Sequence, residues 1–363
     1  KAVEAVPALI PLLKGTDGGM SFAASESLRA LAPFAAKAIA EGLKDEDVAV
    51  RLGVIAALRH GGESAAPCIA NALGDKAPEV RSGAAEALWA LGEKAKSAVP
   101  ALVVALKDSD AGVRRKAATA LARIAPEEKD AIAVLIEALA GKEHEVIGAA
   151  EALEAYGAGA KDAAPAILAA TERCGSGIYL ENALESIGEA CLPALEEALR
   201  TGKRGARHLA ARVAKRFGAK SAPLASALGV ALGDADLYVR SAAAEALCAV
   251  GPAAKEAIVA LEKAAGDPDS RVYGPAARAL GGCGEAGVDP LVRLLQSKSQ
   301  SMKSLALEGL SRIGAPAIPG FVRALEHEDT WVRLGAVAAL DRLAASTPEA
   351  IPALEKAAQD ENL

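Results

Sequence analysis

Hydrophobic residues recur along the chain at the three- and four-residue spacing of an amphipathic helix, and Gly, Pro and Asp interrupt them at regular intervals. Four segments share a Val-Arg opening, an Ala-rich middle and an Ala-Leu pair near the end. They are AVRLGVIAALRHGG at 49–62, EVRSGAAEALWALG at 79–92, YVRSAAAEALCAVG at 238–251 and WVRLGAVAALDRLA at 331–344. Because a recurring unit of this size is typical of repeat proteins, each segment predicts one helix of a repeated structure.

The Leu of each Ala-Leu pair serves as the register mark of a copy. Eleven copies follow one another at spacings of 30 to 33 residues and account for nearly the whole chain. The marks are Leu28, Leu58, Leu88, Leu121, Leu153, Leu184, Ala214, Leu247, Leu280, Leu310 and Leu340. We therefore expect a single array over residues 1–363, with an incomplete last repeat at 352–363, in place of separate domains.

Each copy predicts two helices joined by a short acidic loop. A Pro opens the first helix, an Asp caps the second, and a Gly in the left-handed conformation ends the second. Pro lies 19 to 21 residues before the mark in seven copies: Pro7, Pro67, Pro100, Pro165, Pro193, Pro290 and Pro319. Asp lies eleven residues before the mark in six copies: Asp17, Asp47, Asp110, Asp236, Asp269 and Asp329. Gly lies four residues after the mark in eight copies: Gly62, Gly92, Gly157, Gly188, Gly218, Gly251, Gly284 and Gly314.

The second helix has one buried and one exposed side. Positions one and four residues before the mark are nearly all Ala, and the position three residues after the mark is large and apolar. This pairing of small with large residues predicts that successive helix pairs pack closely. Positions two before and one after the mark are mixed and often charged, so we expect them to face solvent along the second helices.

A second feature of the repeat is an Asp followed six positions later by Arg. It occurs as Asp45 with Arg51, Asp75 with Arg81, Asp108 with Arg114, and Asp234 with Arg240. With these residues the chain resembles the HEAT-like repeat family, in its short bacterial form that also occurs in phycobilin lyases. The resemblance implies an all-α solenoid of the armadillo/HEAT type, built of eleven helix pairs, with a ladder of Asp–Arg pairs between successive repeats.

The physical chemistry agrees with such a ladder, because an Arg fork can bind carboxylates of its own loop and of the next. The Arg position holds Ser21, Val146, Gly177 and Tyr273 in four copies, so we expect the ladder to be interrupted there. In the turn at 174–177, Cys-Gly-Ser-Gly also replaces the capping Asp. We expect curvature or local mobility to change at that turn.

The amino-acid composition reduces the classes of function that this chain can have. The chain has 52% hydrophobic but only 3% aromatic residues, which favours thin helical layers filled by small side chains. A net charge of −6 argues against a dedicated nucleic-acid binder, because phosphate binding needs clustered cations. The five cysteines never form a C-x-x-C pair and no apolar run is long enough to span a membrane. We therefore expect a cytoplasmic protein.

No catalytic or metal site emerges from the motifs. One HEAT-repeat family, the deoxyhypusine hydroxylases, binds two irons through His-Glu pairs, and this chain contains His144-Glu145 and His327-Glu328. These histidines lie nine and thirteen residues before their marks, whereas the pairs of that family lie six and five before, so we expect solvated turn histidines. The resemblance to phycobilin lyases carries over no catalytic residue. We predict a non-enzymatic protein without a cofactor or metal.

The segment 198–233 carries eight Lys and Arg and no Asp or Glu. Its candidate partner-binding residues are Arg204, Arg207, His208, Arg212, Lys215 and Arg216, of which Arg204, His208, Arg212 and Lys215 make one helical stripe. Two interpretations remain open. The stripe binds an anion or an acidic peptide, or it pairs with carboxylates of the preceding repeat, where Glu185 has the same position as Lys215.

Aromatic residues give a further candidate. Trp89 lies one residue after its mark, and Tyr238 and Trp331 both lie nine residues before theirs, all at positions expected to be exposed. We predict an interaction scaffold that binds a protein or peptide along the concave face formed by the second helices. The alternatives are an enzyme subunit or chromophore-lyase-like protein that uses the same groove for a small molecule, and a local nucleic-acid contact at the basic stripe.

Overall fold

The computed structural model describes residues 2–14, 18–174, 177–345 and 347–358. Every regular element in these ranges is helical and none is a strand, which confirms the all-α prediction. The chain forms two compact units, unit 1 (Lys1–Ile187) and unit 2 (Gly188–Leu363). The arrangement of all residues in one continuous array therefore stays a prediction.

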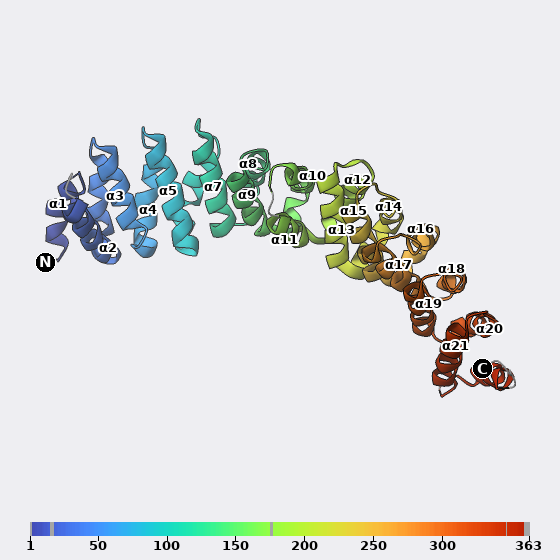
Figure 1. Cartoon of the computed structure of the whole chain (residues 1–363). Coiled ribbons are helices and arrows are strands. Elements are labelled where there is room, and N and C mark those ends of the chain that lie inside the picture. Colours follow the sequence, from blue (N-terminus) through green and yellow to red (C-terminus); the bar gives the residue numbers. More distant parts are fainter. Residues whose placement is uncertain (1, 15–17, 175–176, 346, 359–363) are drawn as a thin grey trace. The chain divides into compact units, whose positions relative to one another are not determined.

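In its described residues, unit 1 contains four separate helix pairs, and α1, α2 and α3 together form two further copies that share α2 (Figure 1). Helix α2 (Gly18–Ala40) joins the second helix of the first copy to the first helix of the next across a kink at Ala35. The first helices are α1 (Val6–Leu9), α4 (Ala66–Ala72), α6 (Val99–Ala105), α8 (Asp130–Ala138) and α10 (Ala164–Ala169). The second helices are α3 (Val48–Leu58), α5 (Pro78–Leu91), α7 (Ala111–Ile124), α9 (Glu143–Glu154) and α11 (Gly177–Ile187).

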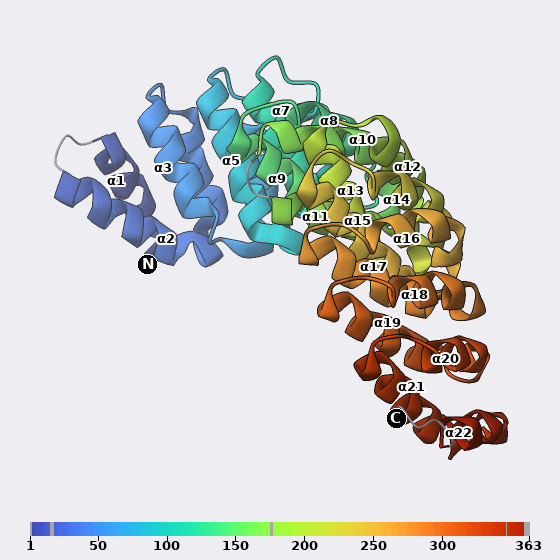
Figure 2. The ribbon, with the colours of Figure 1, turned by 45° about the vertical axis from the view of Figure 1, so that its right-hand side comes forward.

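Unit 2 contains five further pairs, whose first and second helices form two layers (Figure 2). The first helices are α12 (Leu192–Thr201), α14 (Ala225–Ala231), α16 (Ile258–Ala264), α18 (Val288–Leu294) and α20 (Ile318–Leu325). The second helices are α13 (Arg204–Phe217), α15 (Leu237–Val250), α17 (Ser270–Gly282), α19 (Gln300–Ile313) and α21 (Thr330–Ala344). Helix α22 (Ile351–Ala357) follows α21 and is the predicted additional first helix.

Most first helices are preceded by a short 3-10 segment that the sequence pattern does not predict. These segments are η1 (Ala2–Ala5), η4 (Gly62–Ala65), η5 (Gly92–Ala98), η6 (Gly157–Ala163), η8 (Gly188–Cys191), η9 (Gly218–Leu224), η10 (Gly251–Ala257), η11 (Gly284–Gly287), η12 (Ala315–Ala317) and η13 (Pro348–Ala350). Three others, η2 (Ile10–Lys14), η3 (Glu41–Lys44) and η7 (Ala170–Glu172), extend a first helix at its C-terminal end.

The residues that begin and end the helices act as predicted. All eight glycines four residues after a mark have φ between 48° and 78°, a conformation that L side chains rarely adopt, and they end the second helices. The capping Asp accepts a hydrogen bond from a backbone N–H of the next turn at five positions, and Asp17 lies outside the described residues. The five are Asp47, Asp110, Asp236, Asp269 and Asp329.

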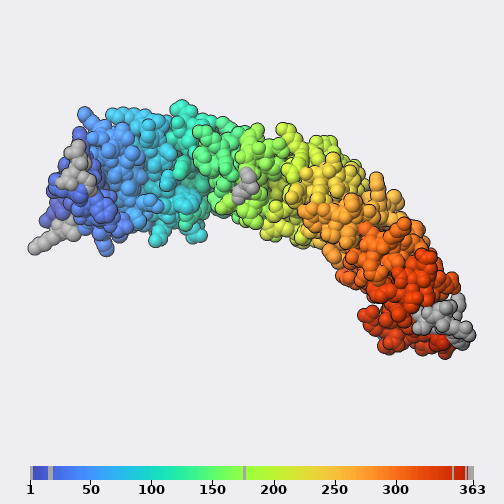
Figure 3. Space-filling view, in the orientation of Figure 1, coloured from blue at the N-terminus to red at the C-terminus, as the bar shows by residue number. Residues whose placement is uncertain are grey.

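The core is built from the predicted positions. All eleven marks are 0% exposed, and the alanines one and four residues before them are buried as well. Within each unit every second helix packs against the next second helix, and the side chains fill the space between neighbouring ribbons (Figure 3). Small residues permit this close approach, so the few aromatic rings of the chain are not needed to fill its interior.

The predicted ladder of charged residues links successive repeats. Nη2 of Arg51 donates to Oδ1 of Asp75 in the next repeat at 2.9 Å, and Nε of Arg81 donates to Oδ2 of Asp108 at 2.7 Å. The ladder is confirmed with one correction. Within its own turn each Arg binds backbone carbonyls and not a carboxylate, as Arg51 does at the carbonyl oxygen of Asp45 over 2.8 Å. Arg240 with Asp267 continues the ladder in unit 2 at 3.0 Å.

Candidate partner-binding surface

Trp89 lies on the exposed side of α5, as its position one residue after the mark predicts. Its side chain is 40% exposed, and the guanidinium carbon of Arg123 on α7 lies 4.6 Å from the ring centroid. This distance is within the range of a cation–π contact, so Arg123 holds the ring in one orientation. The result is a surface in unit 1 that joins a flat apolar ring to a cation.

The six candidate residues of the basic segment all lie on α13, and three of them engage carboxylates of the following repeat. Arg204 donates to Asp236 at 2.6 Å, and the ammonium of Lys215 lies 2.8 Å from Glu245. Arg207 binds Asp234 with two nitrogens, at 2.6 and 3.0 Å, and so belongs to the ladder. Lys220, in the same basic segment, lies 3.5 Å from Glu189 of the preceding repeat. Pairing between repeats therefore accounts for part of the basic segment, in both directions.

The other three candidates, Arg212, Arg216 and His208, lie on the same helix. Arg212 and Arg216 are exposed on α13, and His208 is half-buried with its ring centroid 6.2 Å from that of Tyr238 on α15. Burial, together with the positive charges of Arg212 and Arg204, lowers the pKa of His208 from its ordinary value of 6.5. At neutral pH this imidazole is therefore uncharged and adds no positive charge to the surface.

Tyr238 is the centre of a cluster that the sequence did not predict. Its side chain is 53% exposed, and guanidinium carbons lie on it from two neighbouring repeats, at 5.8 Å for Arg204 and 5.7 Å for Arg271 on α17. Asp236 and Asp269, the caps of α15 and α17, hold these arginines in place. The side-chain hydrogen bonds from Arg271 lower the pKa of Asp269 to about 2.

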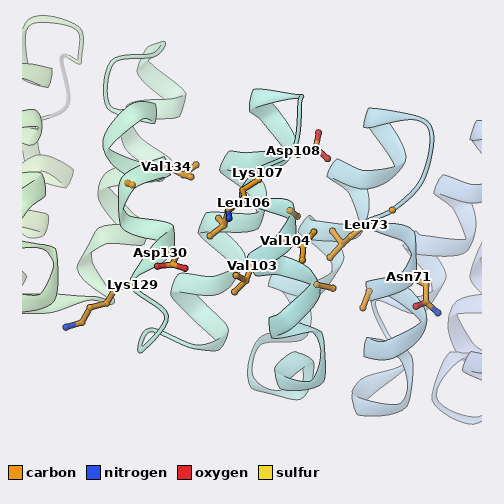
Figure 4. A pocket seen from close by; sticks show the side chains of 15 residues that line it. Asn71, Leu73, Val103, Val104, Leu106, Lys107, Asp108, Lys129, Asp130 and Val134 are labelled. Atoms are coloured by element: carbon orange, nitrogen blue, oxygen red, sulfur yellow. The ribbon is translucent and has the colours of Figure 1, made fainter.

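A groove lies on the first helices of unit 1, away from the predicted surface (Figure 4). It has a volume of about 1140 Å³ and spans α4, α6 and α8. Val103 and Val104 of α6 lie between Leu73 and Val134 from the two flanking repeats, and Val104 is 74% exposed. The groove offers apolar side chains in a shallow surface, a combination that suits weak contacts with apolar groups.

The groove coincides with a departure from the repeat that the sequence shows. Ala125 replaces the Gly expected four residues after Leu121, with φ at −149°, and no 3-10 segment separates α7 from α8. The first helix of this copy therefore starts directly after a short turn, without the 3-10 segment that precedes most first helices. The missing Gly at position 125 is the signal that could have drawn attention to this region.

The histidine prediction is correct for one residue and wrong for the other. His144 is exposed, near the start of α9. His327 is only 7% exposed, because it takes the place of the ladder Asp thirteen residues before the mark and its Nδ1 accepts a hydrogen bond of 3.0 Å from the backbone N–H of Asp329. In the described residues no three His, Cys, Asp or Glu side chains gather as a metal ion would require.

Three of the five cysteines, Cys174, Cys191 and Cys283, are buried. Burial raises the pKa of Cys191 and of Cys283 to about 11, which keeps both as unreactive thiols. Over the described part of the chain, no helix combines the length and the apolar character that crossing a bilayer needs.

Comparisons with known proteins agree with this architecture. A family model described as HEAT repeats matches residues 36–97, 72–155, 192–281, 224–304 and 288–363. Among solved structures, the crystal structure of Kap121p bound to Nup53p is similar with a TM-score of 0.51 and 14% sequence identity. The match covers 98% of this chain and 47% of that one, so the chain spans about half of its length. A comparison with curated proteins finds no match. At this identity the structural similarity concerns the fold alone.

Proposed function

Because this chain belongs to the HEAT-repeat family, we propose that it is a non-catalytic scaffold that binds a protein or peptide on the exposed side of its second helices. We include in this proposal the closer relation to the short bacterial form, which the period of 30 to 33 residues supports. Rigid helices present their side chains in constant positions, so a partner loses little entropy to reorganisation of this surface.

The observation that carries the proposal is the pairing of exposed aromatic rings with arginines on the second helices. Trp89 with Arg123 in unit 1, and Tyr238 with Arg204 and Arg271 in unit 2, form such clusters. Trp, Tyr and Arg are the residues that contribute most binding energy in protein interfaces. In a chain with 3% aromatic residues, exposed rings held in fixed orientations are unusual and call for a partner.

The two alternative functions, binding of a small molecule in the same groove and a nucleic-acid contact at the basic stripe, receive less support. The groove lined by Val103, Val104 and Val134 lies on first helices, and not on the second-helix side where a small molecule was expected. A nucleic-acid contact at the basic segment would compete with Asp234, Asp236 and Glu245, which already pair with its cations. Both facts favour a protein or peptide as the ligand of the second helices.

The experiment is capture of partners from an extract of the source organism by the purified protein and by a Trp89→Ala, Tyr238→Ala double variant. We expect the natural protein to retain at least one partner that the double variant loses. Val259→Ser is the matched control, because Val259 is also exposed but lies on the first helix α16. Equal retention by all three proteins, or no specific partner for any, would refute the proposal.

A further inference from the structure

The surface around Tyr238 defines the chemistry of the partner in unit 2. We propose that Arg204, Tyr238 and Arg271, which we call the Tyr238 platform, bind an acidic segment of a protein partner. This inference rests on the proposed function and specifies the ligand for one part of that surface.

The geometry of the platform is set by three successive repeats. Tyr238 lies near the start of α15, Arg204 at the start of α13, and Arg271 near the start of α17, and these helices pack against one another in sequence. Both guanidinium carbons lie within 6 Å of the Tyr ring centroid, at 5.8 and 5.7 Å, which is the range of cation–π attraction. The platform is therefore organised before any partner arrives.

The acceptor atoms of the platform are already used. Oδ1 of Asp236 accepts hydrogen bonds from the backbone N–H groups of Tyr238 and Val239, at 3.0 and 3.2 Å, and its Oδ2 accepts from Arg204. Both carboxylate oxygens of Asp269 accept from Arg271, at 2.9 and 2.7 Å. These carboxylates hold the helix starts and the arginines, and most of their acceptor capacity is used within the protein.

The terminal donor atoms of Arg204, in contrast, remain available. Arg204 engages Asp236 through Nε alone, and its side chain is 62% exposed with both terminal nitrogens still able to donate. The exposed Lys203 beside it has no ion pair with any described residue. A partner therefore meets N–H donors around an apolar ring, and carboxylates are the groups that accept such hydrogen bonds most strongly.

A phosphate backbone is the competing acceptor, but the platform favours a peptide. Nucleic-acid affinity depends on neutralising many phosphates in a row, and the cations next to the platform, Arg207 and Lys215, are bound to Asp234 and Glu245. One ring between two guanidinium groups matches instead a single acidic side chain with an apolar neighbour, as in a protein interface.

The test uses the full chain and three labelled peptides in which Ala alternates with Glu, Gln or Lys. Fluorescence anisotropy at low and at physiological salt should detect binding of the Glu peptide alone, weakened by salt because exposed charges are screened. Arg204→Gln and Arg271→Gln should each weaken this binding by about fivefold or more, as substitutions at an interface centre do.

Two control variants distinguish a specific effect of the Tyr238 platform from the loss of any exposed arginine or any exposed ring. Arg293→Gln removes an equally exposed arginine that pairs with Glu262 away from the platform, and Trp331→Ala removes a 43% exposed ring at the same repeat position as Tyr238. Neither should change binding of the Glu peptide. Equal loss in the controls, no binding of the Glu peptide, or preferential binding of a single-stranded oligonucleotide would overturn the inference.

The outcomes also distinguish this inference from the proposed function. If the captured partner depends on Trp89 and Tyr238 but the Glu peptide does not bind, the scaffold function stands and the acidic chemistry is wrong. If no partner depends on either ring, the scaffold function fails independently of the peptide result.

Discussion

Two regions of unit 1 solve the same structural problem in different ways. In the copies with Arg51 and Arg81, an arginine closes the turn before the second helix and reaches Asp75 or Asp108 of the next repeat. In the copy marked by Leu153, Val146 takes the Arg position and is 0% exposed. The first region is linked by charge and the second by apolar packing at the same place.

Other contacts replace the ladder where it is missing. Glu145 accepts a hydrogen bond of 2.8 Å from the backbone N–H of Lys142 and so caps α9, and it also pairs with Arg115 of the preceding repeat. Arg114, the last ladder arginine before the gap, pairs with the exposed Glu137 at 3.0 Å. The comparison teaches that the fold requires satisfied turn groups and a filled position, and that it does not require one particular pair.

The largest expected effect comes from breaking the ladder at a nearly buried pair. Arg81 and Asp108 are 13% and 10% exposed, so Arg81→Ala leaves a nearly buried carboxylate without its partner. We expect a loss of about 3 kcal/mol in the free energy of unfolding, measured by urea denaturation followed by circular dichroism. The control Arg293→Ala breaks a pair that is 60% and 35% exposed and should cost less than about 1 kcal/mol. Equal losses of unfolding free energy in the two variants would contradict the interpretation that burial makes the Arg81–Asp108 pair important.

A second set of variants replaces the apolar contact at Val146 with an Arg–Asp pair like those of the ladder. Val146→Arg alone introduces a buried cation with no facing carboxylate and should cost about 2 kcal/mol. Thr171 lies thirteen residues before the mark Leu184, where the ladder Asp would be, so adding Thr171→Asp should recover stability. A double-mutant cycle should give a favourable coupling of about 1 kcal/mol or more. Additive effects would show that the two positions do not meet.

A third, smaller effect concerns the ladder position that holds a histidine. Nε2 of His327 is buried without a hydrogen-bond partner, and Lys303 of the preceding repeat pairs instead with Asp329 at 2.5 Å. His327→Asp should restore the usual pair and stabilise the protein by about 1 kcal/mol, seen as a higher melting temperature. His144→Asp, at an exposed histidine, is the control and should leave the melting temperature almost unchanged. A lower melting temperature for His327→Asp would refute the interpretation.

The smallest effect is a dependence on pH. The hydrogen bonds from Arg81 lower the pKa of Asp108 below its ordinary value of 3.8, so near that pH the unfolded chain binds more protons than the folded one. The ladder's contribution is therefore complete at neutral pH and is lost as the pH falls through the folded pKa. Thermal melts from pH 7 downward should show a smaller acid-induced loss for Arg81→Ala than for the natural protein. Equal losses would mean that other carboxylates dominate.

Much of the fold could be predicted from the sequence because the determining residues act locally. The eight glycines four residues after a mark have positive φ as predicted, and Asp47 and Asp110 cap the helices that follow them. Each depends on backbone geometry within a few residues. The candidate surface was less predictable, since the position of Trp89 indicated exposure but nothing in one copy indicated that Arg123 would cover its ring.

The sequence by itself determined the helix pairs, their period, the buried side of the second helices and the pairing of arginines across repeats, because each of these follows from a motif that recurs. Only the tertiary structure decided which cations of α13 are held by Asp234, Asp236 and Glu245, and that Arg204 and Arg271 enclose Tyr238. It also decided that a groove opens between first helices beside Val104. The physical reason is that these contacts join side chains about one repeat apart, and their distances depend on how closely small residues let neighbouring helices approach.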